Sequence, residues 1–285
     1  MYSQEISRLH HVAVVIAIDQ SSSMSGRMST KDKIISKADA VSMATGKLID
    51  ELIMRSHRDN GYRYYYDIAI LGYSGDRVYS LLGDKIEFVP ITILANRNVR
   101  RTQYCLNYAT LERESTPVDE MVSMWVEPHA EGATPMYKMI KTVTNLVAEW
   151  CDKEENRESF PPLVFNITDG EASDADYEML RKAAQRLKMT GTEDGNTLFM
   201  NIHISSDTNH EQLIFPSPNE VPISVLHAHL LMDMSSLIPE QMYPYIALCR
   251  SNFVKPPYLA MSYNASMSEL IAALNIGSRS LIMGL

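Results

Sequence analysis

Patterns of buried strands alternate with patterns of amphipathic helices along the first two thirds of the chain. Continuous apolar runs rich in valine and isoleucine predict strands that are covered on both faces. Apolar residues spaced three and four positions apart predict the helices between them. The predicted strands are 11–18, 65–73, 85–93, 163–168 and 197–205, and the predicted helices are 32–54, 135–150 and 175–188.

This alternation predicts an α/β fold class, with a parallel sheet and helices on both of its faces. The short run 85–93 is expected at an edge of the sheet. Beyond residue 205 the pattern weakens: 223–231 fits either a strand or a short helix, and 239–249 and 266–274 fit helices. The sequence has no Gly/Ser-rich linker, low-complexity tract or internal repeat. We therefore expect residues 1–285 to form a single domain, with a core of about 9–205 and a C-terminal elaboration, 206–285.

Composition narrows the classes of partner. The net charge of −9 argues against nucleic acid, which requires clustered lysine and arginine, and the one basic cluster, 96–101, is short. No apolar run approaches the roughly 18 residues of a membrane span, and the first residues lack a secretory apolar region. The three cysteines, Cys105, Cys151 and Cys249, are odd in number and far apart. Reduced thiols and a cytoplasmic location are the simplest expectation.

A carboxylate and several hydroxyls stand where the first predicted strand ends. Asp19 follows the apolar run directly, and Ser21 and Ser23 come next in the sequence DQSSS. Open parallel sheets bind ligands at the carboxyl ends of their strands. Alternate residues of an extended loop can converge on one centre, and oxygen donors of this kind suit Mg²⁺ or Mn²⁺.

Two further positions share this placement. Asp169 ends the strand 163–168, with Gly170 allowing a sharp turn, and Thr134 precedes the helix that starts at Pro135. Taken singly, each residue has a structural explanation, because a serine or threonine often caps a helix and an Asp-Gly pair often makes a turn. Three such loops at one end of one sheet favour a metal site with five oxygen ligands.

Asp19-x-Ser21-x-Ser23, Thr134 in GATP and Asp169 in ITDGE resemble the three parts of the metal-ion-dependent adhesion site of von Willebrand factor type A domains. The resemblance covers roughly residues 9–205, and the remainder is similar to bacterial cytosolic members of the family. It implies a Rossmann-like, doubly wound sheet of six mostly parallel strands with one short antiparallel edge strand, which would be 85–93.

The resemblance also implies a role for each site residue. Ser21, Ser23 and Thr134 would be the hydroxyl ligands, and Asp19 and Asp169 the carboxylates that hold a Mg²⁺ or Mn²⁺ ion, often through waters. A metal with mostly neutral direct ligands keeps positive charge and binds an incoming Glu or Asp carboxylate of a partner protein. The loops 24–30, 94–132 and 171–174 would select that partner, with Trp125 as an exposed anchor. The expected setting is a bacterial signalling, stress or defence system.

Two alternatives stay open. A metal site with two aspartates could support phosphoryl transfer or hydrolysis. However, residue 21 is a serine where a D-x-D motif needs an acid, no GxxxxGK[ST] loop or G-x-S-x-G elbow is present, and no lysine or arginine stands at an obvious strand end beside the site. We therefore expect no enzyme activity. The second alternative is a metal-free scaffold of the same fold. The sequence does not determine the oligomeric state.

Overall fold

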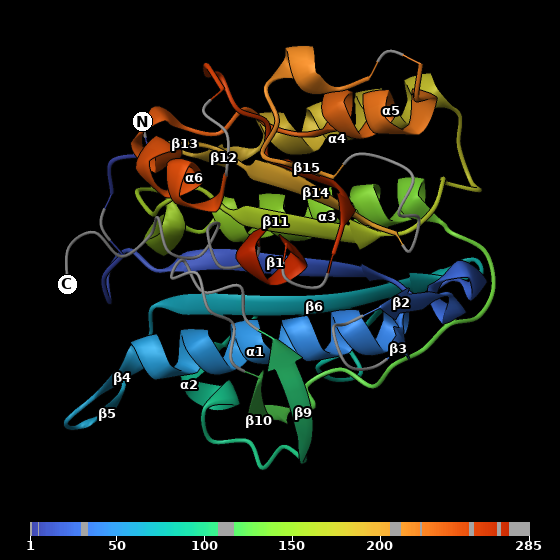
Figure 1. The fold of residues 1–285 in the computed structure, drawn as a ribbon. Helices are drawn as coiled ribbons and strands as arrows, with labels where there is room; N and C mark the ends of the chain where they lie inside the picture. The colour runs from blue at the N-terminus through green and yellow to red at the C-terminus, as the bar shows by residue number, and fades with distance from the viewer. Residues whose placement is uncertain are drawn as a thin grey trace.

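The computed structural model describes residues 2–4, 6–29, 34–107, 117–205, 212–222, 224–250, 254–266 and 269–273. Within this part of the chain, one eight-stranded sheet forms the centre of the molecule (Figure 1). Its parallel strands are β16 (Met261–Ala265), β14 (Leu198–Ile204), β11 (Leu163–Thr168), β1 (Val12–Asp19) and β6 (Tyr66–Ser74). The antiparallel strands are β15 (Leu213–Ile214), β7 (Arg77–Ser80) and β8 (Val89–Pro90).

The strand order places a topological switch point beside β1. The sheet runs β15-β16-β14-β11-β1-β6-β7, so the chain builds β6 and β7 on one side of β1 and then crosses to build β11, β14 and β16 on the other. In a doubly wound sheet, this reversal leaves a ligand-binding crevice at the carboxyl ends of the two strands that flank it. Here those strands are β1, which ends at Asp19, and β11, which ends at Thr168. The predicted α/β, Rossmann-like, doubly wound fold class is confirmed.

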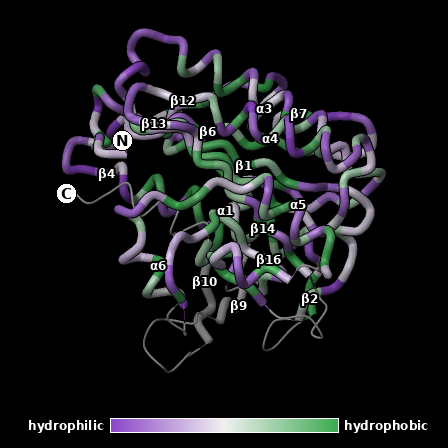
Figure 2. The backbone as a smooth tube through the Cα atoms, turned by 90° about the horizontal axis from the view of Figure 1, so that it is seen from above, coloured by the Kyte–Doolittle hydropathy of each residue, from purple (hydrophilic) through white to green (hydrophobic). Residues whose placement is uncertain are grey.

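Helices cover both faces of the sheet. The side chains of Val14 and Ile16 pack on the face covered by α1 (Lys37–Ser56), and Val15 and Ala17 pack on the face covered by α3 (Met136–Cys151), α4 (Tyr177–Met189) and α5 (Leu226–Met234). All eight residues of β1 are buried, which explains its uninterrupted apolar sequence. Figure 2 shows this hydrophobic centre in green, surrounded by hydrophilic loops.

Shorter elements complete the described part. Short helices are α2 (Ile91–Leu94), α6 (Tyr243–Cys249), η1 (Ser22–Ser25), η2 (Glu154–Asn156), η3 (Pro218–Glu220) and η4 (Glu240–Met242). Hairpins pair β2 (Arg27–Ser29) with β3 (Ile34–Ser36), β4 (His57–Arg58) with β5 (Gly61–Tyr62), β9 (Arg101–Asn107) with β10 (Pro117–Ser123), and β12 (Gly191–Thr192) with β13 (Gly195–Asn196). No helix in the ranges given above is long and apolar enough to cross a membrane.

One sequence expectation about the sheet needs correction. The antiparallel edge strand is β7, whereas 85–93 contributes only the two residues of β8 before the chain turns into α2. Gly75, with φ of +61°, turns the chain back so tightly that Ser74 pairs with Arg77. β7 thereby covers Leu71–Ser74 of β6, and β8 pairs only with Asp67 and Ile68. For the segment 223–231 the sequence allowed either a strand or a short helix, and its residues 226–231 belong to helix α5. The predicted elaboration 206–285 supplies β15 and β16 to the same sheet.

Candidate metal centre

Asp19 is the fully buried last residue of β1. Its Oδ1 accepts a hydrogen bond of 2.9 Å from the Ser21 backbone N–H, and its Oδ2 accepts one of 2.7 Å from the Thr168 hydroxyl. Burial raises the pKa of Asp19 above its usual value, and the nearby Asp169 carboxylate adds to this, although the bonds from Ser21 and Thr168 oppose it. The charge of this carboxylate is therefore only partly compensated by its neighbours.

A chain of hydroxyls joins the end of β1 to the end of β11. The Ser21 and Ser23 hydroxyl oxygens lie 3.0 Å apart, and the Ser23 hydroxyl donates to Asp169 Oδ1 at 2.6 Å. Ser23 is exposed, whereas the side chain of Asp169 is fully buried. The structure thus brings four predicted site residues together, with Ser23 on the side that faces solvent.

Thr134, the fifth predicted site residue, is buried. Its loop forms hydrogen bonds with the loop after β1 and with the loop after β11. Its N–H donates to the Ser173 hydroxyl at 3.0 Å, and its carbonyl accepts from the Ser173 N–H at 2.9 Å, which links it to the loop after Asp169. The Ser22 N–H donates to the carbonyl of Gly132 at 2.9 Å, which links the same loop to the serines. The N-cap of α3 is Pro135, so the explanation of Thr134 as the capping residue is wrong.

Lys37 is a residue of this centre that sequence reasoning missed. Its Nζ lies 2.9 Å from Asp169 Oδ2, and only 11% of the lysine side chain is exposed. The expectation that no lysine or arginine accompanies the site at a strand end is wrong, because Lys37 directly follows the short strand β3 and reaches Asp169 from the first turn of α1. Neither a motif nor the spacing of the sequence shows this approach, since it depends on how α1 packs against the sheet.

A neutral aromatic cluster flanks Asp169 on the β14 side. Burial, together with the neighbouring His227 ring and the Lys37 charge, lowers the pKa of His203 to about 3. The His203 ring stacks on Tyr263 at a centroid distance of 4.6 Å, and its Nδ1 accepts from the Asn264 N–H at 3.2 Å. His203 is therefore uncharged near neutral pH, and it is Lys37 that brings positive charge to Asp169.

The donor set fits a hard divalent cation. Across the described ranges, no three His, Cys, Asp or Glu side chains come together in a group that could hold a metal, so a metal here would rely on hydroxyl oxygens. The centre offers two carboxylates. Asp19 accepts from the Ser21 backbone N–H, and the Ser21 hydroxyl contacts the Ser23 hydroxyl, which donates to Asp169. Oxygen donors alone suit Mg²⁺ or Mn²⁺ better than softer metals.

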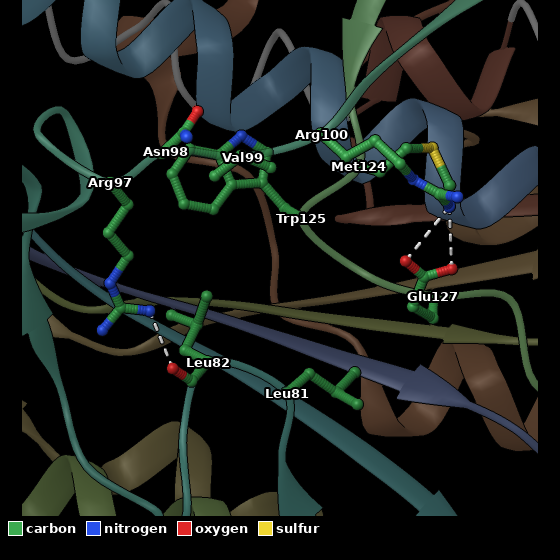
Figure 3. Close-up of a pocket in the computed structure, with 9 residues that line it drawn as sticks. All are labelled: Leu81, Leu82, Arg97, Asn98, Val99, Arg100, Met124, Trp125 and Glu127. Atoms are coloured by element: carbon green, nitrogen blue, oxygen red, sulfur yellow. Dashed lines mark hydrogen bonds and ion pairs between the residues drawn. The ribbon is translucent and has the colours of Figure 1, made fainter.

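A hollow lies between the loop after β7 and the segment that follows α2 (Figure 3). Arg97 donates to the carbonyl of Leu82 at 2.7 Å, and Arg100 pairs with Glu127 at 3.1 Å. An adjoining hollow reaches Gln20, the neighbour of Asp19, so part of the segment 94–132 borders the centre.

Trp125 lines both hollows, but it is not the exposed anchor expected from the sequence. Only 9% of the residue is exposed, and its Nε1 donates to Asp50 Oδ1 at 3.1 Å. Asp50 also accepts from the Ser123 N–H at 3.1 Å. Trp125 therefore helps to fasten the β9–β10 hairpin to α1.

Among known proteins, this chain is similar only in structure to von Willebrand factor type A domains and related proteins whose structures have been solved. No protein-family model and no curated protein matches the sequence. A von Willebrand factor type A structure from Catenulispora acidiphila is 15% identical with a TM-score of 0.41, covering 70% of this chain and 34% of that one. The SpRpn10 VWA domain is 12% identical with a TM-score of 0.42, covering 79% and 83%. The manganese-loaded TRAP protein of Plasmodium vivax is 15% identical with a TM-score of 0.38, covering 85% and 73%.

This chain thus spans about a third of the length of the Catenulispora structure. At sequence identities of 12 to 15% and TM-scores of 0.38 to 0.42, these likenesses do not identify a ligand or a partner. The class of the protein rests on its own strand order and site: it is a doubly wound α/β protein with oxygen-bearing side chains gathered at its switch point.

Proposed function

We propose that this chain is a von Willebrand factor type A-like module that binds a protein partner through a Mg²⁺ or Mn²⁺ ion. The observation that carries the proposal is the hydrogen-bond chain between the buried Asp19 and Asp169 at the switch point. It runs from Asp19 to the Ser21 backbone N–H, and from the Ser21 hydroxyl through the Ser23 hydroxyl to Asp169. The residues that would hold the ion are Asp19, Ser21, Ser23, Thr134 and Asp169.

The protein's own residues prepare this site for a cation. Both oxygens of Asp19 are oriented, by the Ser21 N–H and the Thr168 hydroxyl, and both oxygens of Asp169 are oriented, by Ser23 and Lys37. When bound, a divalent ion with largely neutral ligands supplies an uncompensated positive charge that attracts a carboxylate. The exposed Ser23 marks the side from which a partner's Glu or Asp side chain would approach.

Binding is favoured over catalysis. The ammonium of Lys37 is nearly buried and paired with Asp169, so it does not face a substrate as a phosphate-binding lysine would. The Ser21 hydroxyl contacts that of Ser23, which donates to Asp169, and the Lys37 ammonium already neutralises this carboxylate, which makes Asp169 a weak general base. A role in a bacterial cytosolic signalling, stress or defence system is the setting that we propose for the module.

A matched pair of serine variants tests the proposal. We expect calorimetry to show that Mg²⁺ and Mn²⁺ bind the wild type and the control Ser22→Ala equally, and that Ser23→Ala binds at least about tenfold more weakly. Ser22 and Ser23 are neighbours in η1, and both are exposed. A partner retained from a lysate with Mg²⁺ should be released by EDTA and not retained by Ser23→Ala. Equal, weak metal binding by all three proteins would favour the metal-free scaffold.

A further inference from the structure

The ion pair between Lys37 and Asp169 is a built contact of the fold. The Lys37 N–H donates to the carbonyl of Gly26 at 2.8 Å, and the side chain ends 2.9 Å from Asp169 Oδ2. Between these two points the lysine stem passes Gly26, where an added Cβ would lie 3.4 Å from Lys37 Cε. The backbone of α1, the stem and the ammonium are therefore all placed by neighbours.

Burial makes this pair strong and costly to break. The Asp169 side chain is fully buried and that of Lys37 is 11% exposed, so water screens the two charges weakly. Removing one partner of such a pair leaves a buried charge without compensation. The other side chains against Asp169 do not replace the lysine: Ser23 is neutral, and burial lowers the pKa of both His203 and His227.

A divalent ion held by Asp169 would bring a second positive charge to the carboxylate that Lys37 already neutralises. The ammonium then either stays and repels the ion or withdraws and loses its buried partner. Whether the ammonium stays beside Asp169 or withdraws from it, the positive charge of Lys37 weakens metal binding. Even in a medium as polar as water, a unit charge about 4 Å from a divalent ion weakens its binding by more than tenfold.

We propose that Lys37 is a tethered cation that competes with the divalent ion for Asp169 and thereby sets the metal affinity of the site. The lysine lowers that affinity, and it keeps the Asp169 carboxylate compensated when the ion leaves. Metal occupancy would then follow the concentration of the ion or the arrival of a partner carboxylate that adds its own bond to the metal. This inference rests on the metal site proposed above.

Three variants and the wild type test it by Mn²⁺ calorimetry. Lys37→Met removes the charge and keeps most of the stem, and we expect its Kd for Mn²⁺ to be at least about tenfold lower than that of the wild type. Lys37→Arg keeps the charge and should show no gain in affinity. Lys153→Met is the control for net charge, since this exposed lysine follows α3 at the end away from Thr134, and its Kd should not change.

A second readout does not depend on affinity. In EDTA, Lys37→Met should melt at a lower temperature than Lys153→Met, because Asp169 has lost its counter-ion, and saturating Mn²⁺ should remove that difference. If Lys37→Met does not fold, Lys37→Gln takes its place, because the amide can still donate to Asp169 Oδ2 without a charge.

The outcomes separate the two proposals. Equal or weaker Mn²⁺ binding by the neutral variants, relative to the wild type, would overturn the role of Lys37 and leave the metal site standing. Binding by neither the wild type nor the neutral variants would overturn both. Tighter binding by Lys37→Met that Lys153→Met reproduces would show a general charge effect, and would also overturn the inference.

Discussion

Two buried aspartates of the sheet show how local donors decide what a carboxylate does. Asp19 has two hydrogen-bond donors and a second carboxylate nearby, and its pKa is raised by burial. Asp67, at the opposite end of the sheet, accepts from Tyr64 at 2.7 Å, Trp150 at 2.8 Å and His11 at 3.2 Å. Burial raises the pKa of Asp67, but these three donors outweigh it, so the net shift is downward. Asp67 is satisfied by the protein, whereas the charge of Asp19 is only partly compensated, as the proposed metal site requires.

The lowered pKa of Asp67 predicts a loss of stability in acid. A carboxyl whose pKa is lower in the folded than in the unfolded protein stabilises the fold above the unfolded value, and the contribution disappears as pH falls from about 4 through the folded value. We expect Asp67→Asn to destabilise the protein by about 1–3 kcal/mol at pH 7, since the buried donors lose a charged acceptor.

Urea unfolding at pH 7 and near pH 3 measures this effect. The difference between the wild type and Asp67→Asn should shrink at the lower pH, whereas the exposed Asp59→Asn should resemble the wild type at both. A difference that stays constant with pH would show that the charge of Asp67 contributes nothing.

At the scale of elements, α1 is shaped to receive the β9–β10 hairpin. A Cβ on Gly46 would lie 2.2 Å from the carbonyl oxygen of Ser123. The backbone of β10 therefore occupies the space that a side chain at position 46 of α1 would need. Asp50, one turn later on α1, accepts from the Ser123 N–H and from Trp125 Nε1. The strand β10 and Trp125, which lie in the weakly periodic segment 94–132, are thus held in place by contacts with α1.

Gly46→Ala is expected to destabilise the protein by about 1–3 kcal/mol, because the hairpin must move away from the new methyl group. Helix propensity alone predicts the opposite, a gain of about 1 kcal/mol. The urea midpoint distinguishes the two, with Gly83→Ala as control, since a Cβ at Gly83 meets nothing within 4 Å. A higher midpoint for Gly46→Ala would mean that the hairpin does not depend on this close approach.

For the molecule as a whole, metal binding and folding should be linked. A site assembled from β1, β11 and the loop before α3 exists only in the folded chain, so an ion at 100 times its Kd stabilises the protein by about 2.7 kcal/mol. For a chain of this size, that corresponds to a rise in Tm of several degrees.

Thermal unfolding in EDTA and in saturating Mn²⁺ measures the rise. We expect it in the wild type and not in Asp169→Asn, which lacks a carboxylate of the proposed site. An equal rise in both proteins would place the stabilising ion elsewhere.

The sequence by itself determined the fold class and the residues gathered at the switch point. Asp19 and Asp169 directly follow long apolar runs, and a strand that is buried on both faces is readable from composition alone. Because parallel strands end at one edge of the sheet, the positions of these aspartates could be predicted without knowing how the helices pack. Their role as metal ligands stays a prediction.

Only the tertiary structure decided the features that depend on contacts between distant segments. The edge strand β7 is four residues long, too short for a clear alternation, and it is placed by the turn at Gly75. Trp125 is buried because α1 supplies Asp50 as its partner. Lys37 reaches Asp169 across 132 positions of sequence because α1 packs with its first turn beside the end of β11. Local patterns record which residues avoid water, but a pair of charges is set by the packing that brings them together.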